Sequence, residues 1–184
     1  MYKSALGSSW SSDIRSFFNH WAELRGDALI PASEKFLDSP SPTYMSTSYI
    51  CDMTDEGAIV RFHGTELAER WGRDFTDHEI HEGRKPEFKE RSLINMRQVV
   101  RRPCGYVVRL AFSTSSGRML QSELIQLPLS VKPGRPPRLV CYAIKDAGYR
   151  SNEFIQLYIK THEVDWIDLG AGVPDLPPLD LLSS

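Results

Sequence analysis

Two histidines and two glutamates stand close together in the segment His78-Glu79-Ile80-His81-Glu82. Neutral imidazole is a common metal ligand, and side chains three residues apart share one face of a helix. A zinc protease, however, needs histidines four residues apart. Because the spacing here is three, the pattern favours a solvated polar turn over a metal centre, and we expect no metal.

Another candidate ligand, His63, directly precedes Gly64 and Thr65, where a predicted strand meets a predicted helix. An imidazole in such a position could bind haem or a metal ion. A lone histidine without a defined partner is more often a structural residue. We therefore interpret His63 as structural.

The three cysteines, Cys51, Cys104 and Cys141, are far apart and odd in number, so they cannot all pair within the chain. Buried free thiols in a reducing compartment are the simplest interpretation. Phosphate-binding glycine loops and the Gly-x-Ser-x-Gly nucleophile motif are absent from the sequence. No spacing links serine, histidine and aspartate into a triad. We therefore expect no catalytic residue, and no motif identifies a cofactor.

Basic residues cluster on and before the predicted helix that begins at Pro86 and ends near Arg102. Such a patch could contact an acidic partner, phosphate groups or nucleic acid. The net charge of the whole chain is −2, however, and gives no indication of nucleic-acid binding. A solvated helix face is therefore favoured. The basic residues of segment 84–102 are Arg84, Lys85, Lys89, Arg91, Arg97, Arg101 and Arg102.

The clearest predicted helix follows Ser11-Ser12-Asp13, which offers an N-cap and an acidic first turn, and it ends near Gly26. Its apolar residues recur at helical spacing and form one stripe. Burial of each such side chain stabilises by about 1.5–3 kcal/mol, so the stripe must pack on something. The sequence leaves two alternatives open: packing within the chain, or contact with a second copy or a partner protein. The interface candidates are Ile14, Phe17, Phe18, Trp21 and Leu24.

The rest of the chain alternates between strand and helix patterns, which predicts an α+β fold. A turn at Asp55-Glu56-Gly57 joins two β-prone segments into a hairpin. The predicted elements after the first helix are strands over 49–54 and 58–63, helices over 65–71 and 86–102, and strands over 105–114, 118–129 and 139–144.

A cleft between this sheet and its helices is the expected place for a small-molecule ligand, because such sites are concave and mostly apolar. The alternative is that the same side chains fill the core completely. Arg109 and Gln121 are candidate polar anchors. The candidate apolar lining residues are Phe62, Trp71, Phe88, Met96, Val99 and Tyr142, together with Leu110.

The chain resembles the PAS-like family of short stand-alone alphaproteobacterial proteins over about residues 14–145. The resemblance depends on Trp21-Ala22-Glu23-Leu24-Arg25-Gly26, on Pro31, on Arg61-Phe62-His63-Gly64-Thr65 and on Pro128-Leu129. Ser33 departs from the family pattern, which has a basic residue at that position. The resemblance implies a PAS-like five-stranded antiparallel sheet covered on one face by helices. It also implies a role in signalling, by ligand sensing or by protein docking.

Light-sensing PAS relatives attach a flavin through a cysteine on a helix with polar surroundings. Here Cys51 lies on a predicted strand and Cys104 follows a proline, so that motif is absent. The resemblance supplies no catalytic residues. The alternative function is a small-molecule binding protein or an enzyme that uses the cleft.

The length of 184 residues suits one domain with terminal extensions. We expect a flexible N-terminus (1–11), a PAS-like domain (12–146) and a C-terminal extension (147–184). The N-terminus lacks the apolar segment of a signal peptide, and no segment approaches the length of a membrane span. We therefore expect a soluble cytoplasmic protein that forms a homodimer or contacts a protein partner.

Overall fold

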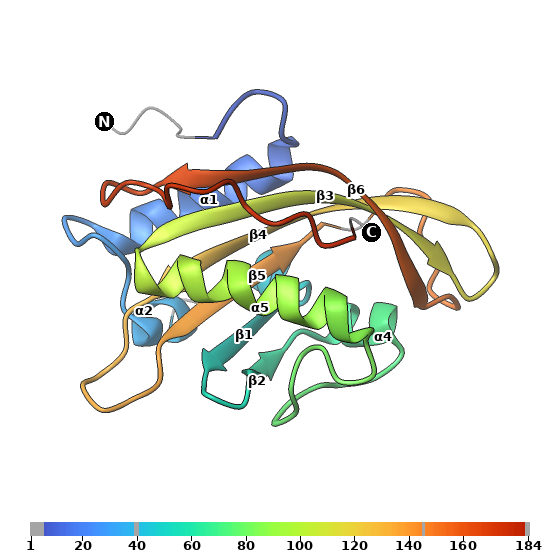
Figure 1. The fold of residues 1–184 in the computed structure, drawn as a ribbon, viewed down its shortest axis with the longest axis horizontal. Coiled ribbons are helices and arrows are strands. Elements are labelled where there is room, and N and C mark those ends of the chain that lie inside the picture. Colours follow the sequence, from blue (N-terminus) through green and yellow to red (C-terminus); the bar gives the residue numbers. More distant parts are fainter. Residues whose placement is uncertain (1–5, 39–40, 145, 183–184) are drawn as a thin grey trace.

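The computed structural model describes residues 6–38, 41–144 and 146–182. An antiparallel sheet with strand order β2-β1-β5-β4-β3-β6 carries helices on both faces (Figure 1). No helix in these three ranges is long and apolar enough to cross a bilayer. The elements are α1 (Ser12–Arg25), α2 (Ser33–Asp38), α3 (Pro42–Met45), β1 (Ser48–Met53), β2 (Ala58–His63), α4 (Thr65–Trp71), α5 (Pro86–Arg101), β3 (Cys104–Thr114), β4 (Met119–Leu129), β5 (Arg138–Ala143) and β6 (Ile155–Asp168).

The sixth strand comes from the segment that the sequence predicts as a C-terminal extension. β6 pairs with β3 along its whole length, from Asp168 opposite Cys104 to Ile155 opposite Thr114. The expectation of a five-stranded sheet is therefore wrong. Without β6, the long strand β3 would present a row of unpaired backbone groups at the edge of the sheet.

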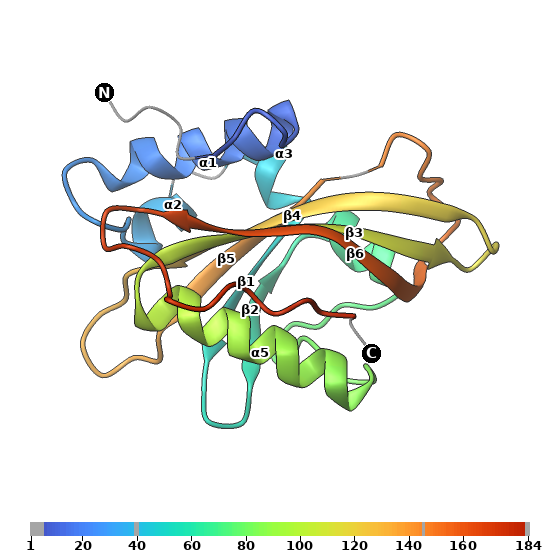
Figure 2. The ribbon, with the colours of Figure 1, turned by 45° about the horizontal axis from the view of Figure 1, so that its top comes forward.

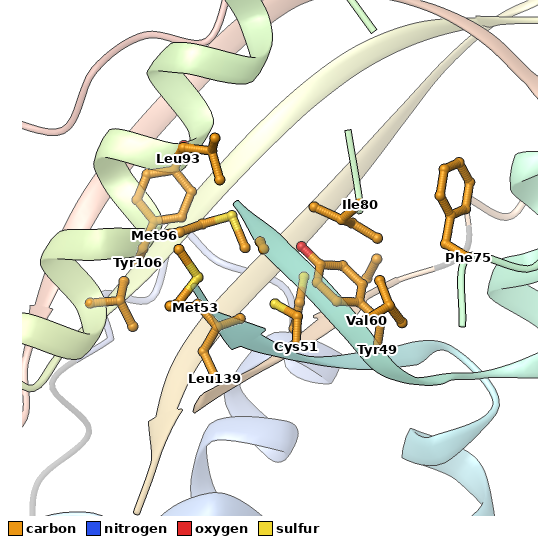
Figure 3. Packing of buried hydrophobic residues seen from close by; sticks show 14 of the residues in the cluster. Tyr49, Cys51, Met53, Val60, Phe75, Ile80, Leu93, Met96, Tyr106 and Leu139 are labelled. Carbon is orange, nitrogen blue, oxygen red and sulfur yellow. The ribbon is translucent and has the colours of Figure 1, made fainter. Parts of the chain in front are cut away.

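Each face of the sheet has its own apolar cluster, because successive side chains of a strand point to opposite faces. On one face, α4 and α5 cover residues such as Tyr49 and Cys51, which belong to what we call the α5-side cluster (Figure 3). On the other face, α1 covers Ile50 and Val140, which belong to the α1-side cluster. Figure 1 shows α5 in front of the strands and α1 behind them. Helices α4 and α5 therefore cover one face, as the resemblance implies, and the N-terminal helix, whose packing the sequence leaves open, covers the other.

Helix α1 begins as the sequence predicts. The side chain of Ser11 accepts a hydrogen bond from the backbone N–H of Ile14 at 3.3 Å and caps the helix. The ring of Phe17 stacks on Tyr142 of β5, with ring centroids 4.6 Å apart. These contacts join the helix to the sheet of its own chain.

The apolar stripe of α1 is buried inside the chain. The side chains of Ile14, Phe17, Phe18 and Trp21 are at most 4% exposed, and Leu24 is half-buried. The interpretation of this stripe as a partner interface is therefore wrong for the four buried residues. They cover the second face of the sheet, which would otherwise lie open to water.

The chain after β6 turns back and runs along α5 (Figure 2). Asn95 of α5 binds the backbone of Leu179 twice: Nδ2 donates to its carbonyl and Oδ1 accepts its N–H, each at 2.9 Å. Arg91 donates to the carbonyl of Asp180 at 2.9 Å. Leu181 is buried in the α5-side cluster. We call residues 174–182 the C-terminal strap.

Candidate ligand-binding cavity

A small cavity of about 50 Å³ lies between the sheet and α5, within the cluster of Figure 3. A water molecule needs about 10–15 Å³ on this measure, so there is room for a ligand of a few non-hydrogen atoms. Helices α4 and α5 and strands from both halves of the sheet contribute its walls. Leu181 of the C-terminal strap contributes a further part.

Helix α4 is positioned by Gly64, whose backbone lies against the backbone of Met45. A Cβ atom at this residue would lie 2.2 Å from the backbone oxygen of Met45, so only glycine fits. The helix begins immediately afterwards at Thr65, with Gly64 as the N-cap. Residues three and four apart share a helix face, and three of them line the cavity: Leu67, Arg70 and Trp71.

Arg70 is the most deeply buried charged side chain of the cavity wall, with 3% of its surface exposed. Nη1 donates to the carbonyl of Ile144 at 2.8 Å, and Nη2 donates to the carbonyl of Ala143 at 2.9 Å. Nε is buried without a hydrogen-bond partner among the described residues. Burial lowers the pKa of Arg70, against the opposing effect of nearby tyrosines such as Tyr158.

Two aromatic rings lie beside this arginine. Phe88 of α5 stacks on Tyr158 of β6, with centroids 5.3 Å apart and an interplanar angle of 4°. The guanidinium of Arg84 lies 5.1 Å from the centroid of the same Tyr158 ring, as a cation–π contact. Burial raises the pKa of Tyr158, while the charges of Arg84 and Arg70 lower it. The phenol therefore remains protonated at neutral pH.

His81 also lines the cavity, and both of its ring nitrogens have protein partners. Nδ1 lies 3.0 Å from Oε1 of Glu79, and Nε2 lies 2.8 Å from the hydroxyl of Ser92 in α5. The prediction of a solvated polar turn is therefore wrong for buried His81, and it is confirmed for exposed His78. Within the described residues, no group of three or more His, Cys, Asp or Glu could hold a metal ion.

A second polar cluster forms the floor of the cavity. Gln126 of β4 donates through Nε2 to the hydroxyl of Tyr49 at 3.2 Å, and its Oε1 is buried without a partner among the described residues. Cys141 of β5 lies beside them, and burial raises its pKa to about 12. Its thiol is therefore protonated and a poor nucleophile at neutral pH.

His63 lies next to the cavity but does not line it. Its Nδ1 accepts a hydrogen bond from the backbone N–H of Phe75 at 3.1 Å, and its ring contacts the rings of Trp71 and Phe75. Asp74 lies 3.4 Å from the same nitrogen, but that nitrogen has no proton to offer a carboxylate while it accepts from Phe75. Burial lowers the pKa of His63, which agrees with a neutral structural residue.

The structure brings only part of the predicted pocket together. Trp71 and Phe88 line the cavity, as does Leu110. Met96 and Val99 belong to the same cluster, but they are fully buried and fill the core beside the cavity. Ligand contact by Trp71 and Phe88 remains a prediction.

Four further predicted pocket residues lie elsewhere. Phe62 and Tyr142 pack in the α1-side cluster on the opposite face of the sheet. Arg109 and Gln121 line a separate open depression of about 330 Å³, where Arg109 pairs with Glu123 at 2.6 Å. The assignment of these four residues to the cleft is wrong, because a shift of one position along a strand moves a side chain to the other face.

The polar residues that distinguish this cavity were not predicted from the sequence. Arg70 lies three residues after Leu67, on the apolar face of a short helix, and an arginine in that position is a recognisable anomaly. His81 and Tyr158 carry no comparable local pattern, because strand pairing and loop packing bring them to the wall. Leu181 reaches the cavity only through the fold of the strap.

Known protein families and solved structures are similar to this chain. The sequence pattern of the family described as "PAS domain" matches residues 10–143. No curated protein matches the chain.

Among solved structures, a fungal LOV domain photoreceptor is 15% identical, with a TM-score of 0.45, over 72% of this chain and 91% of that chain. A variant of the protein RsLOV is 12% identical, with a TM-score of 0.41, over 57% of this chain and 62% of that chain. An RNA-binding Light-Oxygen-Voltage receptor is 14% identical, with a TM-score of 0.38, over 76% of this chain and 35% of that chain.

Proposed function

Because the chain belongs to the PAS domain family, we propose that it is a non-catalytic sensory module that binds a small molecule between α5 and the sheet. The observation that carries the proposal is the cavity itself, where a packed core contains space and unpartnered polar atoms. Those atoms are Nε of Arg70 and Oε1 of Gln126. Buried polar groups are nearly always paired, so a bound molecule or water is the expected partner.

The volume of the cavity favours a small ligand. Pockets for drug-sized ligands measure about 300–1,000 Å³, whereas this one measures about 50 Å³. In this conformation it fits a molecule of a few non-hydrogen atoms and is far too small for a haem or a flavin.

The chemistry of the wall supports binding over catalysis. Both ring nitrogens of His81 are engaged by Glu79 and Ser92, so the imidazole has no free position for proton transfer. The thiol of Cys141 is held in its protonated form by burial. A weak nucleophile and an engaged base are typical of a binding site.

The C-terminal strap is the proposed route of output. Leu181 contributes to the cavity wall, and the backbone of the strap is held by side chains of α5. A ligand that enlarges the cavity would push on Leu181 and weaken these contacts. A released strap would expose α5 and the edge of the sheet to a partner protein or a second copy, which we propose as the receiver of the signal.

Native mass spectrometry and an absorbance scan of freshly purified protein test for a co-purified ligand. Thermal unfolding with a panel of small molecules then tests where a ligand binds. The test variant is Ala143→Val, in which the larger side chain narrows the cavity. Ala111→Val is the matched control, because Ala111 is equally buried in β3 of the same sheet and does not line the cavity. We expect a ligand to raise the Tm of the wild type and the control but not of Ala143→Val. Equal shifts in all three proteins would contradict binding in this cavity.

A further inference from the structure

The charges on the cavity wall are all of one sign. Arg70 and Arg84 line it, while none of its described lining residues is an aspartate or a glutamate. His81 is held by Glu79 outside the wall. Neither Arg70 nor Arg84 forms an ion pair with a described residue, and the charge of Glu66 acts on Arg70 from outside the wall. The wall therefore has an excess of positive charge.

Arg70 contributes the more deeply buried of these two charges. Its guanidinium is almost completely removed from water, and its hydrogen bonds go to two neutral carbonyls at the end of β5. A buried charge is normally paired, because burial of an unpaired ion is strongly unfavourable. Arg70 lines the cavity, and its third donor position, Nε, is buried without a hydrogen-bond partner among the described residues. An anion in the cavity would supply both the missing charge and the missing acceptor.

Arg84 and Tyr158 lie at the same end of the cavity. The guanidinium of Arg84 lies 5.1 Å from the centroid of the Tyr158 ring, and Arg70 lines the same cavity. Burial raises the pKa of this hydroxyl, so it is protonated at neutral pH and can donate a hydrogen bond. Two cations and one hydroxyl donor together form a surface that favours oxygen atoms carrying negative charge.

The rest of the wall is apolar, and it selects among anions. Leu67, Leu110, Leu124 and Ile155 face the remaining space. Inorganic phosphate or sulfate would leave charged oxygens against these side chains, at a large desolvation cost. A short hydrocarbon group would instead bury apolar surface there.

We infer that the ligand of this cavity is a short-chain monocarboxylate, whose carboxylate is bound by Arg70 and Arg84 and whose hydrocarbon part contacts Leu110 and Leu124. This inference rests on the proposed function and specifies its ligand class. The volume of about 50 Å³ limits the chain to a few carbon atoms.

Titration of the full chain with propionate, followed by protein NMR, tests the inference. Propionamide serves as the neutral probe of the same shape, and inorganic phosphate as the anion without a hydrocarbon group. We expect propionate to bind, propionamide to bind at least about tenfold more weakly, and phosphate to bind more weakly still. Equal binding of propionate and propionamide would overturn the anionic assignment, and preferential binding of phosphate would overturn the monocarboxylate.

Variants locate the carboxylate. Arg70→Met and Arg84→Met remove the charges but keep the aliphatic stems, and Arg135→Met is the control at an exposed loop residue. Loss of a charged hydrogen bond should weaken propionate binding roughly tenfold to hundredfold in the two cavity variants and leave the control unchanged. Arg70→Met also loses two structural hydrogen bonds. If that variant fails to fold, Arg70→Lys and Arg84→Met keep the test decisive.

The outcomes separate this inference from the proposed function. If propionamide binds as well as propionate and Ala143→Val abolishes binding of both, the cavity remains the binding site and the anionic assignment fails. If propionate binds and neither the arginine variants nor Ala143→Val changes its affinity, both the cavity site and its ligand class are wrong. Absence of binding by every probe would also overturn the monocarboxylate assignment.

Discussion

Replacement of Trp21 by alanine should unfold or strongly destabilise the chain without separating subunits. The Trp21 side chain is fully buried against the α1-side face of the sheet. Its Nε1 donates to the carbonyl of Pro128 at 3.1 Å in a buried hydrogen bond. The same side chain was one of the interface candidates predicted from the sequence, so this substitution distinguishes core from interface.

The magnitude follows from the two interactions that are lost. Truncation of a buried tryptophan to alanine costs about 3–5 kcal/mol, through lost burial and the cavity left behind. The unpartnered carbonyl of Pro128 adds about 1–3 kcal/mol unless water reaches it. Domains of this kind have a total stability of about 5–15 kcal/mol. We therefore expect a loss of about 4 kcal/mol or more, a large part of the whole.

Urea unfolding followed by circular dichroism measures this loss, and light scattering of the folded protein measures its mass. Leu24→Ala in the same helix is the matched control, because Leu24 is half-buried, and we expect a loss of about 1 kcal/mol there. A Trp21→Ala protein that loses less than about 1 kcal/mol while a dimer dissociates to monomers would refute the assignment of this residue to the core.

Three further predictions concern other parts of the chain. Burial alone would raise the pKa of Asp52, but hydrogen bonds from Arg138 and a second arginine outweigh it and lower that pKa. Asp52→Asn should therefore lose about 2 kcal/mol in urea unfolding at pH 7. The difference should shrink as the pH falls below about 4, because the carboxylate of the unfolded chain takes up a proton before that of the folded chain, whose pKa is lower. A difference that is constant down to pH 2 would contradict this. Cys141 and the other two cysteines are buried free thiols, so a thiol reagent should react only after denaturant is added, and rapid reaction of native protein would show that the core opens. Asn95→Ala removes both hydrogen bonds to the backbone of Leu179, so hydrogen exchange of that amide should accelerate at least tenfold while exchange in β3 stays unchanged.

Local pattern in the sequence was sufficient for most of the elements. Helix α1 follows from apolar residues at helical spacing after the cap at Ser11, and its bounds agree closely with the prediction. The hairpin of β1 and β2 follows from the turn at Gly57, whose φ of 142° requires glycine. The period-2 alternation of β3 likewise separates Tyr106 and Val108 from Val107.

The assignment of β6 shows where local pattern was ambiguous. Ile155, Leu157 and Ile159 alternate as in a strand, while Phe154, Leu157 and Tyr158 also fit a helical period. The edge of β3 decides between them, because its unpaired backbone groups provide a partner for a strand and none for a helix. A pairing between segments about fifty residues apart leaves no mark in a short window of sequence.

The sequence by itself therefore determined the order and type of most elements, the absence of known catalytic motifs and the resemblance to the PAS family. Tertiary structure alone decided which face each strand residue occupies, as in the placement of Phe62 and Tyr142 away from the cavity. It also brought Arg70 and Leu181 to one cavity from opposite ends of the fold. The physical reason is that periodicity is set by neighbouring residues, whereas burial and charge balance depend on contacts between segments that are distant in the chain.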